Sequence, residues 1–496
     1  MKLVTTSQMA DIDAQAQAEG FPGEVLMENA GIRAHAEIAG ILDSVSPGGE
    51  VLYIAGKGNN GGDALVMARQ AKLEGRDNIR VLCIEKDGSP LFMKQLAMIE
   101  QMQIPVSLYS DEKTLESILI QADVIIDGIS GTGIKGRLRA PLDRLVEQIN
   151  SATGYVISID VPSGIGPSFE NGYPAVTAKQ TITMGLPKYC LFTPLARKNC
   201  GRISVVNPSF PPALIAAAKP AGYWQEPGDL PTFFPEISRD TYKNKRGKLA
   251  VFAGAQGTHG ASVLCSHAAA RSLAGLVTLF IDKQIYGSVS SQCSSVMVRQ
   301  RSGRMPELEG YHGLCAGPGW GKLDDRKETL RNMILTGLPG VIDADGLYHL
   351  KQLKKEGNLP DLGQKWVLTP HPGEFAYISS VEKAEVFQDP VTAVRKAAAE
   401  YNAVVVLKGH VTWVCTPKGD AYVIDGMNPA MATGGSGDIL AGIIAGLITF
   451  GLSTEKAAVA GVLIHQLAGK RCFCEKGWFI AEEMQYYIGG ILKEVL

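Results

Sequence analysis

The sequence has no long uninterrupted hydrophobic run and no excess of charge of one sign. Its longest apolar stretch, residues 439–452, is interrupted by glycines and is shorter than the ~20 residues that a membrane-spanning helix needs. The 48 basic and 50 acidic residues leave a formal net charge of −2, which gives no electrostatic attraction to nucleic acid or to an anionic membrane. We therefore expect no nucleic-acid partner and no membrane partner, and we interpret residues 439–452 as a buried helix.

A disulfide framework is missing as well. The nine cysteines are an odd number and are scattered without the spacing of a disulfide-rich scaffold, which is typical of a reducing compartment. The segment Met1–Met9 has no apolar core of the kind that signal peptides carry. We therefore expect a cytoplasmic protein.

The 496 residues are too many for a single hydrophobic core, so we expect two domains. Strand-like apolar runs alternate with helical patterns in both halves, which is typical of α/β folds with parallel sheets covered by helices. Prolines crowd residues 207–235, and proline lacks a backbone donor and disfavours a helical predecessor. We predict an N-terminal domain at 1–210, a proline-rich connection at 211–241 and a C-terminal domain at 242–496. Strands are expected at 50–55, 79–84, 123–127, 155–160, 181–184, 248–252, 276–281, 313–316, 340–343, 366–369 and 403–407.

A glycine-rich loop, Gly56–Asp63, lies between the first of these strands and a helix predicted at 63–74. In doubly wound sheets such a loop lets backbone N–H groups approach a phosphate group, and Asn59 and Asn60 add side-chain donors and acceptors. The loop matches neither the GxGxxG dinucleotide fingerprint nor the GK[ST] ending of a P-loop. It therefore predicts a ligand site, but not ordinary NAD docking.

Two further apolar strands of the first half end in aspartate, at Asp127 and at Asp160, and each is followed by a glycine-containing loop. A single aspartate at a strand end is more often a turn former than a functional group. Ligands of open α/β sheets, however, bind outside the carboxyl ends of the strands, where all three loops converge. The three loops together therefore predict one crevice.

Close to the C-terminus, Gly434, Gly435 and Gly437 precede Asp438 and an apolar helical pattern. Glycines let backbone N–H groups converge on an anion, and the positive end of the following helix adds to the attraction. Asp438, in the first helical turn, is placed to accept a proton from an attacking hydroxyl group. The pattern predicts a site for phosphoryl transfer, to which Lys408 would add a positive charge.

The motifs Gly58–Asp63, Gly131–Gly133 and Asp160–Gly164 together resemble the NAD(P)H-hydrate epimerase family over about residues 1–210. The resemblance implies that these loops hold a hydrated nicotinamide nucleotide and a potassium ion, with Asp160 as the catalytic acid/base that helps to invert C6 of the hydrate. Potassium would be bound by Asn60, Asp127 and Ser163. The implied substrate contacts are Asn59, Asn60, Gly61, Gly62, Asp63, Gly131, Thr132, Gly133, Ile134, Lys135, Gly136 and Arg137.

From about residue 242 onward the chain resembles the ADP/ATP-dependent NAD(P)H-hydrate dehydratases of the ribokinase-like superfamily. Five ordered motifs carry this resemblance: Gly317–Gly321, Asp343–Leu347, Leu368–Glu374, Leu407–Thr412 and Gly434–Asp438. It implies that Asp438 deprotonates the C6 hydroxyl of the hydrate, that the nucleotide phosphorylates it, and that phosphate is then lost. Gly319 and His371 would contact the substrate, and magnesium would bridge the nucleotide phosphates. The implied nucleotide contacts are Lys408, Gly409, His410, Val411, Thr412, Asn428, Thr433, Gly434, Gly435, Ser436 and Gly437.

Together the two resemblances imply an α/β protein with an N-terminal Rossmann-like three-layer αβα sandwich and a C-terminal ribokinase-like αβα domain. They imply an enzyme that interconverts the R and S hydrates of NADH or NADPH and dehydrates the S form at the expense of ADP or ATP. We also expect a homo-oligomer. Two alternatives remain open: a kinase of a sugar or vitamin precursor, and a protein whose first half only binds a nucleotide and scaffolds partners.

Two positions depart from the dehydratase pattern. Trp320 stands where we expect an aliphatic residue, and we expect it to narrow the nucleotide or substrate pocket. Ala430 stands where we expect glycine, and we expect it to stiffen the closing loop. Neither change removes a catalytic group.

Overall fold

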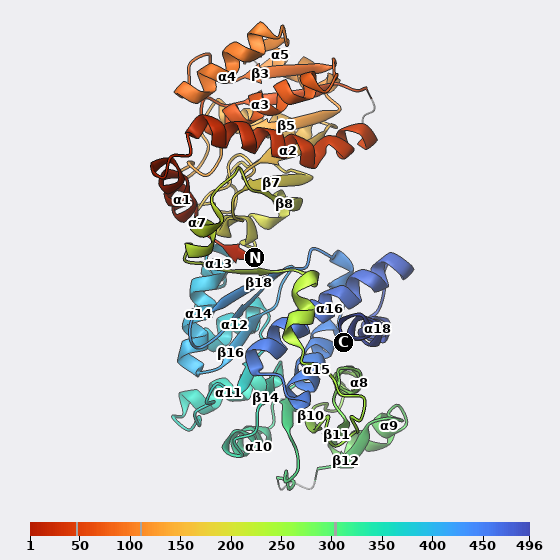
Figure 1. Cartoon of the computed structure of the whole chain (residues 1–496). Coiled ribbons are helices and arrows are strands. Elements are labelled where there is room, and N and C mark those ends of the chain that lie inside the picture. Colours follow the sequence, from red (N-terminus) through yellow and green to blue (C-terminus); the bar gives the residue numbers. More distant parts are fainter. Residues whose placement is uncertain (46–47, 110–111, 302–304) are drawn as a thin grey trace. The chain divides into compact units, whose positions relative to one another are not determined.

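The computed structural model describes residues 1–45, 48–109, 112–301 and 305–496, without the side chains of 112–114. The chain folds into two compact units, Met1–Tyr223 and Trp224–Leu496 (Figure 1). The division falls inside the proline-rich stretch, which is itself structured and holds α7 (Pro212–Ala217), β9 (Gly222–Gln225) and the 3-10 helix η3 (Pro227–Phe233). Among the described residues no helix is both long and apolar enough to cross a bilayer.

The first unit is built on a parallel sheet with the strand order β4-β3-β2-β5-β6-β7-β8. The order reverses between β2 and β5, so the chain runs outward from β2 on one side and from β5 on the other. The strands are β2 (Val51–Ala55), β3 (Ile79–Cys83), β4 (Val106–Leu108), β5 (Val124–Gly128), β6 (Tyr155–Ile159), β7 (Gln180–Met184) and β8 (Arg202–Val206). The helices are α1 (Thr6–Ala18), α2 (Gly23–Val45), α3 (Asn59–Leu73), α4 (Pro90–Gln101), α5 (Glu112–Gln121) and α6 (Leu142–Ser151), and a short β1 (Lys2–Leu3) pairs with β9.

Helices cover both faces of this sheet (Figure 1). Successive side chains of a strand point to opposite faces, and in β2 Tyr53 packs in a cluster with residues of α2 and α3. Its neighbours Leu52 and Ile54 pack instead in a second cluster, with residues of α5 and α6. The predicted three-layer αβα sandwich is therefore confirmed.

Helix α3 begins at Asn59, so the prediction that this helix starts at Asp63 is wrong by one turn. Gly61 explains why the first turn can form so close to the strand end: a Cβ at this position would lie 1.7 Å from the carbonyl oxygen of Gly56. Much of the predicted loop is thus the N-terminal turn of a helix. The N–H groups of such a turn have no partner inside the helix and are free for a ligand.

We predict that Gly61→Ala lowers the free energy of unfolding of the first unit by about 2–3 kcal/mol, because backbone must move to admit the methyl group. Gly40 is the matched control, since it lies in α2 and a Cβ added there would have no atom within 4 Å. Gly40→Ala should raise stability by about 0.5–1 kcal/mol through helix propensity. Thermal unfolding of the intact chain measures both changes, and equal transition temperatures for the two variants would contradict the packing argument.

The second unit has the strand order β18-β17-β16-β15-β14-β13-β10-β11-β12, which reverses between β10 and β13. The strands from β12 to β16 are parallel, but β17 pairs antiparallel with both β16 and β18. The expected parallel sheet is therefore present, with an antiparallel pair of strands added at this edge. The strands are β10 (Lys248–Phe252), β11 (Leu276–Ile281), β12 (Met297–Gln300), β13 (Gly313–Ala316), β14 (Gly340–Ile342), β15 (Trp366–Leu368), β16 (Val404–Leu407), β17 (Val411–Cys415) and β18 (Ala421–Asp425).

The predicted buried helix is α15 (Ser436–Phe450), whose residues from Ile439 to Thr449 are all buried. It packs tightly on α8 (His259–Arg271), because a Cβ at Gly442 would lie 2.2 Å from the carbonyl oxygen of Cys265. The glycines inside the apolar stretch thus allow close helix packing. The remaining helices include α10 (Asp324–Leu335), α11 (Asp345–Lys355), α12 (Pro372–Ser379), α14 (Pro390–Tyr401), α16 (Thr454–Lys476) and α18 (Ile488–Val495).

Candidate active sites

The first unit contains a cavity of about 440 Å³ at the edge of the sheet where the strand order reverses. This is the place where open α/β sheets bind ligands. The cavity wall combines the first turn of α3, the loop after β5, Asp160 after β6, and residues of α1 and α2. The predicted site residues that line it are Asn59, Asn60, Asp63, Gly131, Thr132, Gly133 and Asp160.

Other predicted contacts of this unit lie elsewhere. Gly61 and Gly62 are buried inside the first turn of α3, where Gly62 packs against Met27. They shape the turn instead of lining the cavity. Four residues that continue the loop after β5 are also outside the cavity wall: Ile134, Lys135, Gly136 and Arg137.

Asp160 is held in the left-handed backbone region with φ of 65°. Its carboxylate accepts a hydrogen bond from the Met184 N–H at 3.2 Å and is ion-paired with Lys188. The Lys188 ammonium is almost completely buried and also donates to the Met184 carbonyl at 2.6 Å and to the Thr183 hydroxyl at 3.0 Å. Since a buried ammonium is costly without a partner, the pair keeps both charges inside the cavity wall.

Lys188 was not predicted, although a lysine that closely follows the apolar strand β7 and Gly185-Leu186 was a usable signal. Asp13 of α1, which lines the same cavity, was not predicted either. Only the fold brings α1 to this edge of the sheet.

The three predicted potassium ligands lie around the ends of β5 and β6. Asp127 is fully buried and accepts from the Ser163 N–H at 2.9 Å, the Ser163 hydroxyl at 2.5 Å and the Ser158 hydroxyl at 2.7 Å. Burial raises the pKa of Asp127, although these hydrogen bonds act in the opposite direction. The amide group of Asn60 is buried and neither its oxygen nor its nitrogen has a hydrogen-bond partner among the described residues. Buried polar atoms without partners are rare, and an oxygen ligand set of this kind fits a hard cation.

In the second unit a cluster of charged groups lies at the ends of β14 and β16. The Lys408 ammonium donates to Asp343 at 2.8 Å and lies 3.8 Å from the Glu374 carboxylate. Asp343 is buried and also accepts from the Thr369 hydroxyl at 2.8 Å. Burial lowers the pKa of Lys408, but attraction to Asp343, Glu374 and Asp438 outweighs it and raises the pKa overall.

Asp438 belongs to the same cluster. It lies in the first turn of α15, and burial raises its pKa to about 7, with repulsion from Asp343 as the next contribution and attraction to Lys408 opposing both. A carboxylate with a pKa near neutrality is suited to act as a general base. The geometry thus places a base beside a fixed cation.

The loop before α15 is shaped by Gly435, whose φ of 93° is in the left-handed region. The Ser436 hydroxyl donates to the Thr433 carbonyl at 3.0 Å, and a Cβ at Gly437 would lie 3.3 Å from the Lys408 nitrogen. His465 of α16 donates through Nε2 to the Ser436 carbonyl at 2.8 Å, and burial lowers its pKa to about 4, so the ring is neutral. His465 was not predicted to take part in this loop.

The other predicted nucleotide contacts have different surroundings. Gly409 and His410 form the exposed turn between β16 and β17, whereas Val411 and Thr412 are buried in β17. The Thr412 hydroxyl donates to the Gly409 carbonyl at 3.2 Å. Asn428 accepts from the Ala430 N–H at 3.1 Å, so it shapes the segment before the glycine loop.

His371 is the N-cap of α12. Its Nδ1 accepts from the N–H groups of Gly373 at 3.0 Å and Glu374 at 3.3 Å, and its backbone N–H donates to the Glu374 carboxylate at 2.8 Å. This capping box fixes the ring, whose Nε2 lies 3.5 Å from the Glu374 carboxylate while the side chain stays 56% exposed.

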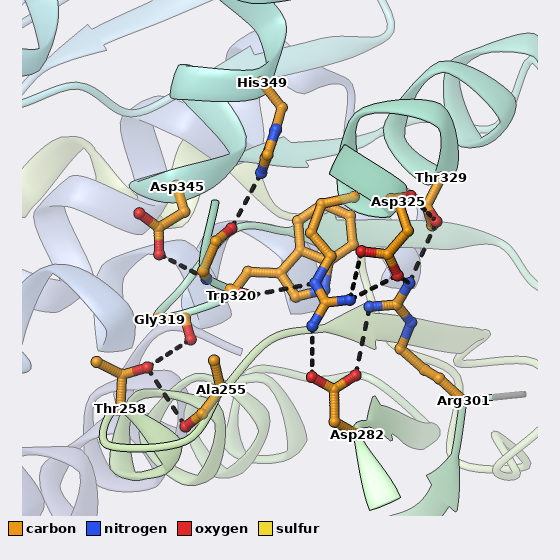
Figure 2. A network of polar contacts seen from close by, with 12 residues as sticks. Ala255, Thr258, Asp282, Arg301, Gly319, Trp320, Asp325, Thr329, Asp345 and His349 are labelled. Atoms are coloured by element: carbon orange, nitrogen blue, oxygen red, sulfur yellow. Dashed lines mark hydrogen bonds and ion pairs between the residues drawn. The ribbon is translucent and has the colours of Figure 1, made fainter. Parts of the chain in front are cut away.

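Polar contacts also hold the Gly317–Gly321 loop, as Figure 2 shows. The Thr258 hydroxyl donates to the Gly319 carbonyl at 2.8 Å, and Asp345 accepts from the Gly321 N–H at 2.8 Å. His349 donates to the Gly321 carbonyl at 3.0 Å. The loop that carries Gly319 is therefore anchored from α11 and from the start of α8.

Trp320 does not narrow a pocket, contrary to our expectation. Its side chain is 1% exposed and packs edge-on against Phe252 and His349, with the Arg301 guanidinium over its ring. Trp320, His349 and Arg301 are labelled in Figure 2. It fills the core beneath the Gly317–Gly321 loop. Ala430 is likewise 1% exposed and lies in the 3-10 turn Pro429–Met431.

Comparison with known proteins identifies relatives along nearly the whole chain. A family profile described as NAD(P)H-hydrate dehydratase matches residues 249–488, and one described as YjeF-related protein N-terminus matches residues 23–190. The bifunctional NAD(P)H-hydrate repair enzyme Nnr of Coxiella burnetii is 34% identical over 480 residues, covering 96% of this chain and 96% of the relative. The Nnr of Thermofilum pendens is 32% identical over 499 residues, covering 96% of this chain and 93% of the relative.

A solved structure shares the fold of the second unit. The ADP/ATP-dependent NAD(P)H-hydrate dehydratase of Bacillus subtilis, co-crystallised with ATP and Mg²⁺, matches 56% of this chain and 99% of its own with a TM-score of 0.51 and 21% identity. This likeness shows that the second unit has the same fold as that structure. Because the similarity to the repair enzymes spans both units, the chain belongs to the bifunctional NAD(P)H-hydrate repair enzyme family.

Proposed function

We propose that the first unit interconverts the R and S hydrates of NADH or NADPH, and that the second unit dehydrates the S form at the expense of ADP or ATP. The observation that carries this proposal is the pairing of two catalytic constellations in one chain of this family: Asp160 with Lys188 in a cavity, and Asp438 with Lys408 beside a glycine loop. A kinase of a sugar or vitamin precursor would need only the second constellation.

In the second unit the nucleotide phosphates bind at the N-terminus of α15, where the free N–H groups of the first turn and the Lys408 ammonium attract anions. Asp438 takes the proton from the C6 hydroxyl of the hydrate, which then attacks the terminal phosphorus of the nucleotide. The phosphate added at C6 is a better leaving group than hydroxide, and its loss together with a proton from C5 regenerates the dihydronicotinamide ring. The nucleotide contacts are Lys408, Gly409, His410, Val411, Thr412, Asn428, Thr433, Gly434, Gly435, Ser436 and Gly437, and the substrate contacts are Gly319 and His371.

In the first unit the hydrate occupies the cavity against Asn59, Asn60 and Asp63, with Gly131–Gly133 also in the cavity wall. Asp160 acts as the acid/base that helps to invert C6, and Lys188 holds its carboxylate in position. Potassium would be held by Asn60, Asp127 and Ser163 and would supply positive charge next to the substrate. The buried amide oxygen of Asn60, which has no partner among the described residues, supports this site.

Magnesium would be bound mainly by the nucleotide phosphates and water, as it often is in phosphoryl-transfer enzymes. No group of three or more His, Cys, Asp or Glu side chains able to hold a metal occurs in the described part of the chain. We further propose a cytoplasmic homo-oligomer without nucleic-acid or membrane partners. The net charge of −2 supports the exclusion of nucleic acid.

The test of the second activity mixes the protein and magnesium with purified S hydrate and either ADP or ATP, and follows both reduced nicotinamide and free phosphate. The proposal expects the two products in equal amounts, and the faster nucleotide is the natural donor. A stable phosphorylated product without reduced nicotinamide would favour the kinase alternative. No reaction with either nucleotide would contradict the proposed dehydratase.

We predict that Lys408→Met slows the dehydratase by about 10²–10³-fold, because a fixed charge that stabilises the transferred phosphoryl group is lost. The change also leaves the buried Asp343 carboxylate without its cation, which destabilises the unit. The double variant Lys408→Met/Asp343→Asn removes both charges and tests function without this unpaired charge. Lys418→Met, at an exposed position in the β17–β18 turn, is the matched control. A double variant that folds and turns over at the normal rate would contradict the role of Lys408.

A further inference from the structure

The charged side chains that line the cavity of the first unit are Asp13, Asp63, Asp160 and Lys188. Lys188 forms its ion pair with Asp160. The carboxyl group of Asp63 has no hydrogen-bond or ion-pair partner among the residues that the structure describes. The cavity therefore holds one carboxylate whose charge is balanced and one carboxyl group whose charge is not.

The surroundings of Asp63 favour its protonated form. Burial raises the pKa of Asp63 well above its usual value, and the negative charges of Asp160 and Asp13 raise it further, while Lys188 lowers it. These are the charged groups that face Asp63 from α1, from the end of β6 and from the segment after β7. Two carboxyl groups in one site, one protonated and one ionised, form an acid/base pair.

We propose that Asp63 is a second catalytic residue of the epimerase, which donates a proton to the C6 hydroxyl while the Asp160 carboxylate activates the water that replaces it. Sequence resemblance gives Asp63 only as a substrate contact. The inference rests on the proposed epimerase function and identifies Asp63 as the source of the proton that the departing C6 hydroxyl receives. Asp63 is well placed for this part because it lies close along α3 to the wall residues Asn59 and Asn60.

The step balances without an oxidant or a reductant. The C6–O bond breaks as the lone pair of the ring nitrogen forms a double bond to C6, and the departing hydroxyl takes the proton of Asp63 and leaves as water. A second water then adds to the opposite face of C6, the double-bond electrons return to nitrogen, and the water's proton passes to Asp160. Transfer of this proton through water back to Asp63 completes the cycle. In the opposite direction Asp160 is the proton donor and Asp63 is the proton acceptor, as microscopic reversibility requires.

The first test is Asp63→Asn in the intact chain, assayed from R hydrate to S hydrate with potassium and without nucleotide. An amide has nearly the same shape but cannot donate a proton of this kind, so we expect kcat to fall by about 10²-fold or more with KM changed little. Asp63→Glu should recover part of the rate. Asp87→Asn, at an exposed position, is the control for the chemical change.

The pH profile separates a proton donor from a simple contact. The wild-type rate should fall as pH rises through the raised pKa of Asp63, because only the protonated acid is active. Asp63→Asn should lose this limb. A raised KM with unchanged kcat and an unchanged profile would show that Asp63 only binds the substrate and would overturn the inference.

An isotope measurement tests the bond that breaks, and it needs no variant. Hydrate labelled with ¹⁸O at C6 should lose the label to water once per epimerisation, beyond the loss in a blank without enzyme. Retention of the label would overturn the inference, even if Asp63→Asn failed to fold. If the wild-type chain does not epimerise the hydrates at all, the proposed epimerase function is wrong. If the wild-type chain epimerises them and Asp63→Asn does so equally fast, only the proposed role of Asp63 as proton donor is wrong.

Discussion

The Asp438→Asn chain is expected to lose the dehydratase reaction by about 10²–10⁴-fold and to keep the epimerase reaction at its normal rate. The amide preserves the shape of the side chain but cannot take the proton of the C6 hydroxyl. Lys408 and the loop Gly434–Gly437 remain, so nucleotide binding should change little. Initial rates with purified S hydrate and saturating ADP or ATP measure the loss.

The pH dependence of the dehydratase rate is a second, independent test of Asp438 as the base. The base is active when it is ionised, so kcat/KM of the wild-type dehydratase should rise as pH rises through about 7, the pKa to which burial raises Asp438. The residual activity of Asp438→Asn should lack this rise. Asp324→Asn, an exposed aspartate in the first turn of α10, controls for the same chemical change near the start of a helix. A variant with the wild-type rate, or a wild-type profile that is flat between about pH 5 and 9, would exclude Asp438 as the base.

The ionised Asp438 carboxylate should also lower the free energy of unfolding of the chain. Its pKa is raised from 3.8 to about 7 in the folded chain. The destabilisation is therefore largest above pH 7, where the group is ionised in the folded chain, and it decreases as pH falls toward 3.8. Asp438→Asn should therefore unfold at a higher temperature than the wild type at about pH 8, and this advantage should diminish at about pH 5. Functional groups that reduce stability are common in active sites.

The Asp160→Asn chain is expected to lose epimerisation by about 10²–10⁴-fold while the dehydratase still consumes the S hydrate. Asparagine tolerates the left-handed backbone with φ of 65°, so the substitution should leave the local backbone unchanged. Lys188 loses its carboxylate but keeps its bonds to Thr183 and Met184. Chiral separation of the two hydrates over time measures the rate.

The control for this variant is again Asp87→Asn, which makes the same change at an exposed site. If the first half of the chain were only a binding module, Asp160→Asn would equilibrate the hydrates no differently from the control. Purified Asp160→Asn protein that interconverts the hydrates at the wild-type rate would remove Asp160 from the mechanism.

The buried central strands could be predicted from sequence because their signal is local. In β10, β11, β13 and β16 continuous apolar runs end at a turn, and the predicted bounds agree with the structure to within one residue. The antiparallel pair β17 and β18 was not predicted. A strand's partner and direction depend on the rest of the sheet, and periodicity within the strand does not specify them.

The glycine loop before α15 could likewise be predicted, because glycines, Asp438 and an apolar helix lie together in sequence. Lys188 and His465 could not be identified in this way. Lys188 is distant in sequence from Asp160, and His465 lies in the interior of a long helix, so only tertiary packing brings each to its site. His371 shows the opposite case, because its motif was recognised but its part in capping α12 became visible only in the fold.

Whether one chain carries both activities is tested most directly by a single experiment. Pure R hydrate is mixed with the intact chain, potassium, magnesium and ADP or ATP, and the absorbance of reduced nicotinamide is followed to completion beside the Asp160→Asn chain. We expect complete recovery by the wild type, and recovery by the variant only at the rate of spontaneous epimerisation. Equal rates for the two chains, or no recovery from either hydrate, would show that the chain does not combine the two activities.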